Sequence, residues 1–398
     1  MQKAINFTKK YPLLVGFCAF MLVVFVADMF ATGKQFSELE NRSLKQRPHF
    51  SWRSLAANEY TRKYEEFIND QFVERDRWIS LKSATESLLL KVENNGVAFG
   101  AHDYLFGVKT SADEAQLDKN LGYLNRFLGS YSGHVTVGII PNSYELMQSY
   151  LPTGLAHIQL KQQPYIEKIY SALQGSDLTT LDVSGALAAD LQNRGEDTYY
   201  RTDHHWTTEG AYAAYAAYCQ SRGLTAVQLS DIEHLRREEK SFYGTYYSKA
   251  KKVGTPAETL VWYDVPVTEM TVNGKNYVEN ADNTKTPIAG LYHQEKFATR
   301  DKYAAFLYGN NGLTVIKSEN NLNKQEGKTS RLLLIKDSYS NCLTPFLTYS
   351  YDELYVVDLR GLTQKLSQLI ATTEFDDIFL LYNYESFESD RNITRLVF

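Results

Sequence analysis

Short apolar runs separated by amphipathic segments organise the chain from about residue 97 onward. Residues spaced three and four apart predict helices over 113–128 and 163–173 and another after residue 207. Such alternation of strands and helices is typical of an α/β protein with a mostly parallel sheet flanked by helices. The apolar runs themselves predict buried strands at 134–141, 178–183, 331–337, 354–360 and 377–383.

A stretch at about 254–320 interrupts this rhythm. The segment "MTVNGKNYV" predicts a hairpin around an Asn-Gly turn, and "AAFLYGNNGLTVIKS" predicts a second hairpin around Gly-Asn-Asn-Gly. We interpret this stretch as a β insertion within a domain that spans residues 97–398.

Residues 34–96 have a different pattern, which predicts a tether followed by helices. The first part is polar and is interrupted by Pro48, so we expect it to be irregular. Apolar residues at helical spacing then predict two amphipathic helices that cover the main domain, and we assign them no chemistry. One contains Ala56, Tyr60, Tyr64 and Phe67, and the other contains Trp78, Leu81, Thr85 and Leu88.

An apolar segment lies near the amino terminus. Residues 13–27 carry no charge, and Lys3, Lys9 and Lys10 precede them. This pattern predicts a cytoplasmic tip and transmembrane helix over residues 1–33, giving a single-pass cell-membrane protein whose remaining residues are extracytoplasmic. The run is slightly short for a spanning helix, so a cleaved signal peptide is the alternative, although no small-x-small pair marks a cleavage site.

The composition argues against a nucleic-acid partner and against a fold held together by many disulfides. A net charge of -5 and a pI near 6.0 provide no basic surface field, so we expect no nucleic-acid partner. The exported part has two cysteines, Cys219 and Cys342, which form either one disulfide or two buried thiols. Neither a disulfide-rich scaffold nor a CxxC zinc knuckle is present in the sequence.

The segment "TDHHW" at 202–206 contains the first part of a candidate site. In an extended segment Asp203 and His205 lie on one face and His204 on the other. Thr207 is a suitable helix N-cap with Glu209 in the first turn, so the histidines precede the helix. An aspartate that orients an imidazole is two-thirds of a nucleophilic triad.

The segment "LLLIKDSYSNC" provides a nucleophile. Ser338 follows a buried strand at its carboxyl end, which is where α/β sheets bind their ligands. Pro345 would interrupt a helix that began at the serine, whereas Thr344 as N-cap with Pro345 at the first helical position is favourable. We therefore expect Ser338 to lie on a loop.

These residues belong to a longer set of landmarks. With them, the sequence resembles the DHHW family, relatives of the SGNH-hydrolase-like alginate O-acetyltransferases of bacterial exopolysaccharide systems. The landmarks span nearly the whole exported chain: "ELENR" at 38–42, "NDQFVERDRWISLKS" at 69–83, "NNGVAFGAHDYLF" at 94–106, "IIPNSYELM" at 139–147, "DHHW" at 203–206, "SFYGTYYSKA" at 241–250 and "KDSYS" at 336–340.

The resemblance implies an SGNH-like, flavodoxin-like fold and a cell-surface or secreted polysaccharide as substrate. It also implies catalytic roles for Asp203, His205 and Ser338, in the permuted order found in the alginate-type acetyltransferases. It suggests a membrane-bound O-acyltransferase partner as the acyl source, and no cofactor. The expected activity is transfer of an acetyl group to a glycan; an acetylesterase with the same residues, and a non-catalytic polysaccharide-binding or assembly protein, are the alternatives.

Two questions stay open at the candidate site. Lys336 stands where SGNH enzymes commonly have glycine, which leaves the oxyanion hole uncertain; the Ser338 amide, Arg360 and Tyr382 are its candidate donors. A metal site built from residues 203–205 would define a metal-dependent hydrolase. We expect none, because neighbouring histidines in an extended segment point apart and no further ligands lie nearby in the sequence.

Overall fold

The computed structural model describes residues 9–30, 33–37, 42–279 and 284–397. The chain forms two compact units, one of residues 1–91 with 251–253 and the other of residues 92–250 with 254–398. The family landmark at 38–42 lies almost wholly outside the described residues, as does Lys3 of the predicted cytoplasmic tip. Each unit is described separately below.

The first unit consists of helices and a two-stranded ribbon. The second predicted amphipathic segment is one helix, whereas the first is divided, because Ala56 ends α3 and Asn58, with positive φ, precedes α4. The apolar segment near the amino terminus forms α2. Among the described residues, the structure has no helix that is long and apolar enough to cross a membrane. The elements are α2 (Pro12–Phe30), β1 (Phe36–Ser37), β2 (Arg42–Ser43), α3 (Trp52–Ala56), α4 (Glu59–Gln71) and α5 (Arg75–Leu88).

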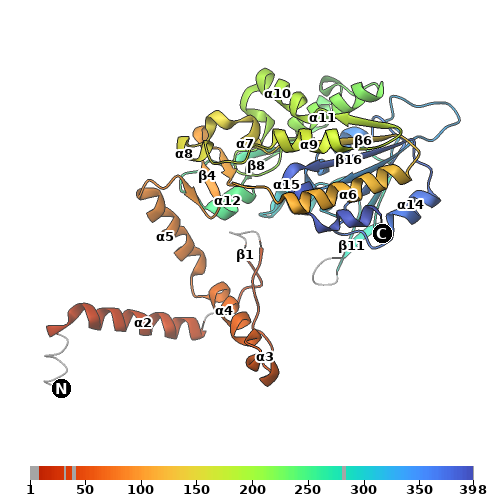
Figure 1. Ribbon diagram of the computed structural model, residues 1–398. Helices are drawn as coiled ribbons and strands as arrows, with labels where there is room; N and C mark the ends of the chain where they lie inside the picture. Colours follow the sequence, from red (N-terminus) through yellow and green to blue (C-terminus); the bar gives the residue numbers. More distant parts are fainter. Residues whose placement is uncertain (1–8, 31–32, 38–41, 280–283, 398) are drawn as a thin grey trace. The chain divides into compact units, whose positions relative to one another are not determined.

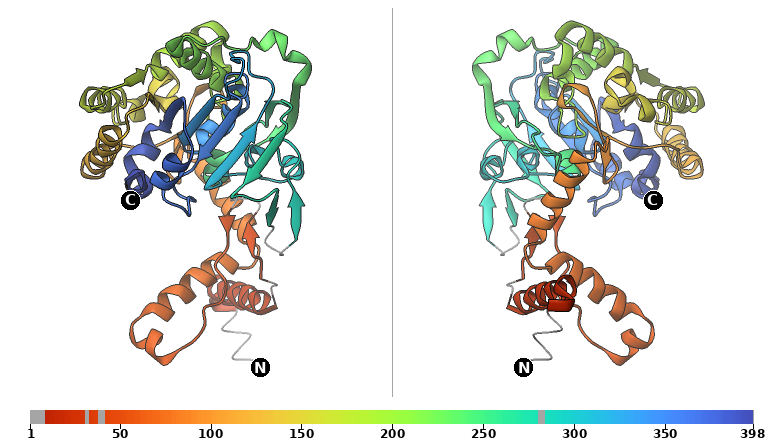
Figure 2. Two further views of the ribbon diagram at one scale, coloured as in Figure 1. Left: turned by 90° about the vertical axis from the view of Figure 1, so that its right-hand side faces the viewer. Right: turned by 90° about the vertical axis from the view of Figure 1, so that its left-hand side faces the viewer.

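The second unit is built on a seven-stranded sheet (Figures 1 and 2). Five neighbouring strands pair in parallel, and β13 and then β10 add to one edge through antiparallel pairs. The sheet is therefore mixed but mostly parallel. The strands, in spatial order, are β10 (Glu269–Val272), β13 (Leu313–Lys317), β15 (Glu353–Val357), β14 (Arg331–Lys336), β16 (Asp377–Asn383), β6 (Val135–Ile140) and β7 (Leu178–Leu181).

The strand order differs from the flavodoxin-like expectation. Numbered along the chain, the five parallel strands lie in the order 2-1-5-3-4, because the last strand, β16, pairs with both β6 and β14. A flavodoxin-like sheet has the order 2-1-3-4-5. A continuous apolar run predicts that a strand is buried, but it does not predict which strands lie beside it in the sheet.

Helices cover both faces of the sheet. Side chains of β14 alternate between the faces: Leu332 and Leu334 join one core, and Leu333 and Ile335 join the other. The first core also contains residues of α10 (Val183–Arg194) and α11 (Thr208–Arg222). The second contains residues of α6 (Glu114–Ser130), α9 (Gln163–Ala172), α14 (Leu366–Thr372) and α15 (Tyr384–Ser389).

The insertion does not form the two predicted hairpins. The first turn is present, with positive φ at Asn273 and Gly274, but β10 pairs with β13, and the following strand β11 (Tyr277–Glu279) pairs with β12 (Lys285–Pro287). In the second segment, the residues before the Gly-rich turn form a 3-10 helix at Lys302–Ala305. The edge of the large sheet offers β13 a longer partner than a local hairpin would.

Smaller elements complete the second unit. A three-stranded sheet contains β3 (Glu93–Asn94), β4 (Val97–Phe99) and β5 (Leu105–Gly107), and a ribbon contains β8 (Arg236–Phe242) and β9 (Glu258–Tyr263). The short helices used below are α12 (Thr245–Ala250) and α13 (Thr344–Leu347).

Candidate active site

Ser338 lies where the sequence places it, just beyond the carboxyl end of β14. It begins a 3-10 turn, Ser338–Asn341, rather than an irregular loop. Asp337 caps this turn, because its carboxylate accepts the Tyr339 amide at 3.0 Å and the Asn383 amide at 2.9 Å. Pro345 stands in the first turn of α13 as expected, although Leu343 rather than Thr344 is its N-cap.

Three predicted residues come together in a single chain of polar contacts. The Nδ1 atom of His205 lies 2.5 Å from Oδ1 of Asp203, and its Nε2 atom lies 2.9 Å from Oγ of Ser338. The His205 amide also donates to Asp203 Oδ1 at 3.0 Å. Asp203 and His205 are buried and Ser338 is half-buried, so the serine hydroxyl is the most accessible member of the chain.

His204 does not point away from this chain. Its ring centroid is 3.8 Å from that of His205, and its Nδ1 atom lies 3.5 Å from Asp203 Oδ1. The expectation that neighbouring histidines lie on opposite faces is therefore wrong. Residues 201–205 form bends rather than a strand, so the alternation of an extended chain does not apply.

The site keeps Asp203 ionised. Burial alone would raise the pKa of its carboxyl group, but His204, His205 and the Thr245 amide hold that pKa well below its usual range. Burial lowers the pKa of His204 to about 3, with a further contribution from the neighbouring His205. Asp203 is therefore the anionic partner, and His204 is neutral near pH 7.

Residues distant in sequence hold Asp203 in place. The Thr245 amide at the start of α12 donates to Asp203 Oδ2 at 2.6 Å, and the Gly244 amide donates to the Thr202 hydroxyl at 2.9 Å. Glu258 of β9 accepts the Thr202 amide at 2.7 Å, the Thr202 hydroxyl and one further amide. A Cβ atom on Gly244 would lie 2.1 Å from the Asp203 Cβ atom, so only glycine fits there.

Sequence reasoning did not identify these supporting residues. Gly244 falls within the landmark "SFYGTYYSKA", which was the only signal for it, and nothing in the sequence marked Glu258. Trp206 is fully buried, and its indole N–H donates to the Tyr339 carbonyl at 2.8 Å. It therefore anchors the Asp–His loop against the turn that contains the serine.

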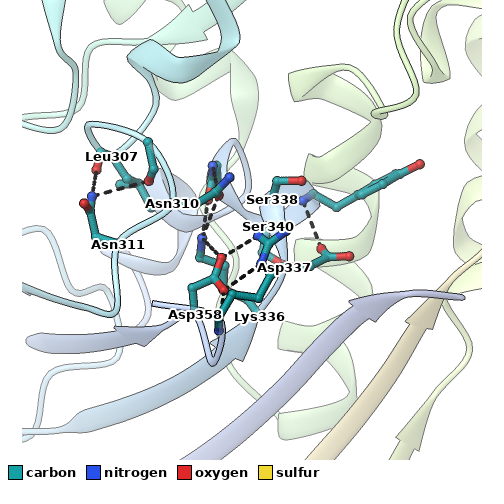
Figure 3. A network of polar contacts seen from close by, with 12 residues as sticks. Leu307, Asn310, Asn311, Lys336, Asp337, Ser338, Ser340 and Asp358 are labelled. Carbon is teal, nitrogen blue, oxygen red and sulfur yellow. Dashed lines mark hydrogen bonds and ion pairs between the residues drawn. The ribbon is translucent and has the colours of Figure 1, made fainter. Parts of the chain in front are cut away.

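A buried charge network lies beneath this turn (Figure 3). Lys336 donates to Asn341 Oδ1 at 2.6 Å, and its Nζ atom is 3.7 Å from Asp358 Oδ2. Burial lowers the pKa of Lys336 to about 8, against the opposing influence of Asp358. The Arg360 guanidinium donates two hydrogen bonds, of 2.9 and 2.6 Å, to the same Asp358 carboxylate.

The other two predicted residues, Arg360 and Tyr382, make contacts with groups other than the serine hydroxyl. The Arg360 guanidinium is partly exposed and is committed to Asp358. Tyr382 is buried in the second core, where its ring lies against Phe387, on the face of the sheet opposite Trp206. Its oxyanion role would need the ring to leave that core.

The same loop contains a group of residues that could hold a metal ion, Asp203, His204 and His205. Their ligand atoms lie within 4.8 Å of one another. Both ring nitrogens of His205 are, however, engaged, one by Asp203 and the other by Ser338. The geometry thus fits proton transfer between Ser338 and His205 better than metal coordination.

A Ser–His–Asp arrangement recurs on several unrelated folds, including more than one α/β fold, so comparison with known families shows which class this chain resembles. Residues 187–357 match the model of the DHHW protein family. Residues 97–271 match the model of the SGNH hydrolase-like domain of the acetyltransferase AlgX. The resemblance inferred from the sequence is therefore confirmed.

Solved structures share the fold. A DHHW family protein from Eubacterium siraeum DSM 15702 is 23% identical, with a TM-score of 0.59 over 76% of this chain and 96% of that one. PatB1 of Bacillus cereus is 18% identical, with a TM-score of 0.59 over 73% of this chain and 97% of that one. At these identities the likeness concerns the fold alone. No curated protein matches the chain.

Proposed function

We propose that the protein is an extracytoplasmic polysaccharide O-acetyltransferase that works through an acetylated serine. The observation that supports this proposal most directly is the contact chain from Asp203 through His205 to Ser338, with separations of 2.5 and 2.9 Å. The match to the AlgX-type acetyltransferase domain supports the choice of acyl group. The lysine-flanked apolar segment near the amino terminus is typical of exported proteins and supports the location.

The first half-reaction acetylates the enzyme. Ser338 Oγ attacks the carbonyl carbon of an acetyl donor, and His205 Nε2 takes the hydroxyl proton. The carbonyl electron pair moves to oxygen, and it returns when the donor's leaving group departs with the proton from His205. Asp203 stabilises the imidazolium that exists between these steps.

The second half-reaction transfers the acetyl group to a glycan. A sugar hydroxyl gives its proton to His205 and attacks the acetyl-serine, and Ser338 recovers a proton as it leaves. Water in place of the sugar would make the protein an acetylesterase. The donor would be presented by a membrane-bound O-acyltransferase partner, because acetyl-coenzyme A is a cytoplasmic compound.

The oxyanion requires hydrogen-bond donors near Ser338. The Tyr339 amide is engaged by Asp337, so the Ser338 amide is our first candidate. Arg360 is the second, since its guanidinium follows the neighbouring strand β15 and is partly exposed. Each such donor contributes about a hundred- to a thousand-fold in rate.

Mass spectrometry after brief incubation with 4-nitrophenyl acetate tests the nucleophile. We expect an acetyl adduct on Ser338 that is absent from Ser338→Ala and His205→Ala. Ser340→Ala is the matched control, because Ser340 lies in the same turn but is fully buried and donates to the Leu381 carbonyl. Absence of both the adduct and ester turnover from the native protein would support a polysaccharide-binding role instead.

A second assay separates transfer from hydrolysis. Acetyl release to water is compared with acetyl transfer to neutral and acidic oligosaccharides, using the same acylated enzyme. Preferential transfer supports the acetyltransferase, whereas release that no oligosaccharide diverts supports the esterase. Activity that is lost with a chelator and restored by zinc would instead indicate a metal-dependent hydrolase at residues 203–205.

A further inference from the structure

The β insertion contributes an aromatic ring to the candidate active site. Tyr303, in the 3-10 helix at Lys302–Ala305, lies face to face with His205: the ring centroids are 3.9 Å apart and the planes differ by 10°. Its hydroxyl donates to the Ser338 carbonyl at 3.1 Å. One side chain thus contacts both the imidazole and the residue that carries the attacking oxygen.

We propose that Tyr303 is a positioning residue that holds the His205 imidazole in line with Ser338 and stabilises the imidazolium through the face of its ring. The proposal rests on the acyl-transfer function proposed above. It concerns the moment when the Ser338 proton has moved to His205 Nε2 and the new bond from Oγ to carbon is forming. The ring of tyrosine has a negative face, so a cation stacked on it is stabilised.

The surroundings of Tyr303 suit this role. The residue is only 6% exposed, so water does not screen the interaction between the two rings. Burial raises the pKa of its hydroxyl well above the ordinary value, and the group therefore remains a neutral donor to Ser338. Phe306 packs against Tyr303 with a centroid separation of 5.1 Å and limits movement of the ring.

Other aromatic and charged groups also surround His205 and its neighbours. Asp203 and His204 approach it from its own loop, and Tyr339 approaches from the serine turn with a centroid separation of 4.9 Å. Arg300 interacts electrostatically with Asp203. Lys249 and Arg360 act in the same way on His204. All of them are unchanged when Tyr303 alone is replaced, so a difference between variants reports on the tyrosine.

Three substitutions in the full-length protein separate its two contacts. Tyr303→Phe keeps the ring over His205 and removes the bond to Ser338. Tyr303→Met removes the aromatic face as well as the bond to Ser338, so its difference from Tyr303→Phe reports on the ring alone. Tyr303→Leu repeats this test with a stiffer side chain in case one variant folds poorly. Phe306→Leu is the control for lost packing in the same segment, since Phe306 packs beside Tyr303.

Two readouts decide the question. The first is the pH midpoint at which the His205 ring protonates, followed by NMR, and the second is kcat for 4-nitrophenyl acetate. In Tyr303→Met and Tyr303→Leu we expect the midpoint to move down by about one pH unit and kcat to fall about tenfold. Tyr303→Phe and Phe306→Leu should retain the native midpoint.

The midpoint does not depend on turnover, so it distinguishes this inference from the proposed function. A native protein without ester turnover refutes the function, while the NMR result still tests the stacking. A midpoint in folded Tyr303→Met and Tyr303→Leu equal to that of the native protein overturns the inference. An equal shift in Phe306→Leu also overturns it, because general loosening of the insertion would then explain the effect.

Discussion

Glu258 should make the stability of the protein depend on pH near neutrality. Burial raises the pKa of its carboxyl group from an ordinary 4.5 to about 7, although its hydrogen bonds from Arg201 and Thr202 oppose that rise. A carboxyl group with a raised pKa favours folding when it is protonated. Its contribution is fully present below about pH 4.5 and is lost as the pH rises through 7.

The magnitude follows from the difference between the two pKa values. At 1.36 kcal/mol for each pH unit, the change from 4.5 to about 7 corresponds to a loss of up to about 3 kcal/mol between pH 4.5 and 8. Glu258→Gln has no proton to lose, and its side-chain oxygen can still accept from a backbone amide. We therefore expect the native protein to lose stability relative to Glu258→Gln across this interval.

Urea unfolding of both proteins from pH 4.5 to 8 measures this difference. Other buried carboxyl groups, such as Glu209 and Glu385, are present in both proteins and cancel. Asp203 titrates well below the interval, so its own ionisation does not contribute. A free-energy difference between the two proteins that stays constant with pH would refute the reasoning, since it would mean that Glu258 titrates like a solvated carboxyl group.

Three further predictions concern the same site. Gly244→Ala places a Cβ atom 2.1 Å from that of Asp203 and should lower ester turnover at least a hundredfold, whereas Gly122→Ala, whose new methyl group meets nothing within 4 Å, should leave turnover unchanged. Lys336→Met removes a buried ammonium group, and burial lowers the pKa of that group to about 8. Chemical unfolding should therefore show the native protein gaining stability relative to this variant as the pH rises from 8 to 10. Trp206→Phe removes the 2.8 Å bond from the indole and should cost about 1–3 kcal/mol in thermal unfolding; a cost near zero would contradict its anchoring role.

The sequence was sufficient to predict those features that depend on neighbouring residues. The parallel strands were predictable because each is a short, continuous apolar run. The pairing of Asp203 with His205 was predicted from the alternation of an extended segment, and the two residues do pair, although the segment forms bends. Ser338 was predictable because it follows such a strand directly. In each case the evidence lies within about ten residues.

Features that depend on distant segments were not predictable. The turn at residues 273–274 formed, yet the strand before it pairs with the edge of the large sheet, because a tight turn does not determine which partner buries more surface. Glu258 and Tyr303 contact the site from the β insertion, in which the sequence pattern marked no functional residue. Their positions follow from how that insertion packs, which no spacing in the sequence records.

Asp203 and His205 precede Ser338 in the chain. This order is compatible with the site because the Asp–His loop is attached to the sheet by its own hydrogen bonds. At its start, the Tyr199 hydroxyl donates to the Pro141 carbonyl at 2.9 Å, beyond the end of β6. At its end, the Trp206 indole donates to a carbonyl of the serine turn. These two attachments, rather than continuity with a neighbouring strand, place His205 beside Ser338. The same geometry can therefore be reached from another chain order, provided that the loop meets these two points of the sheet.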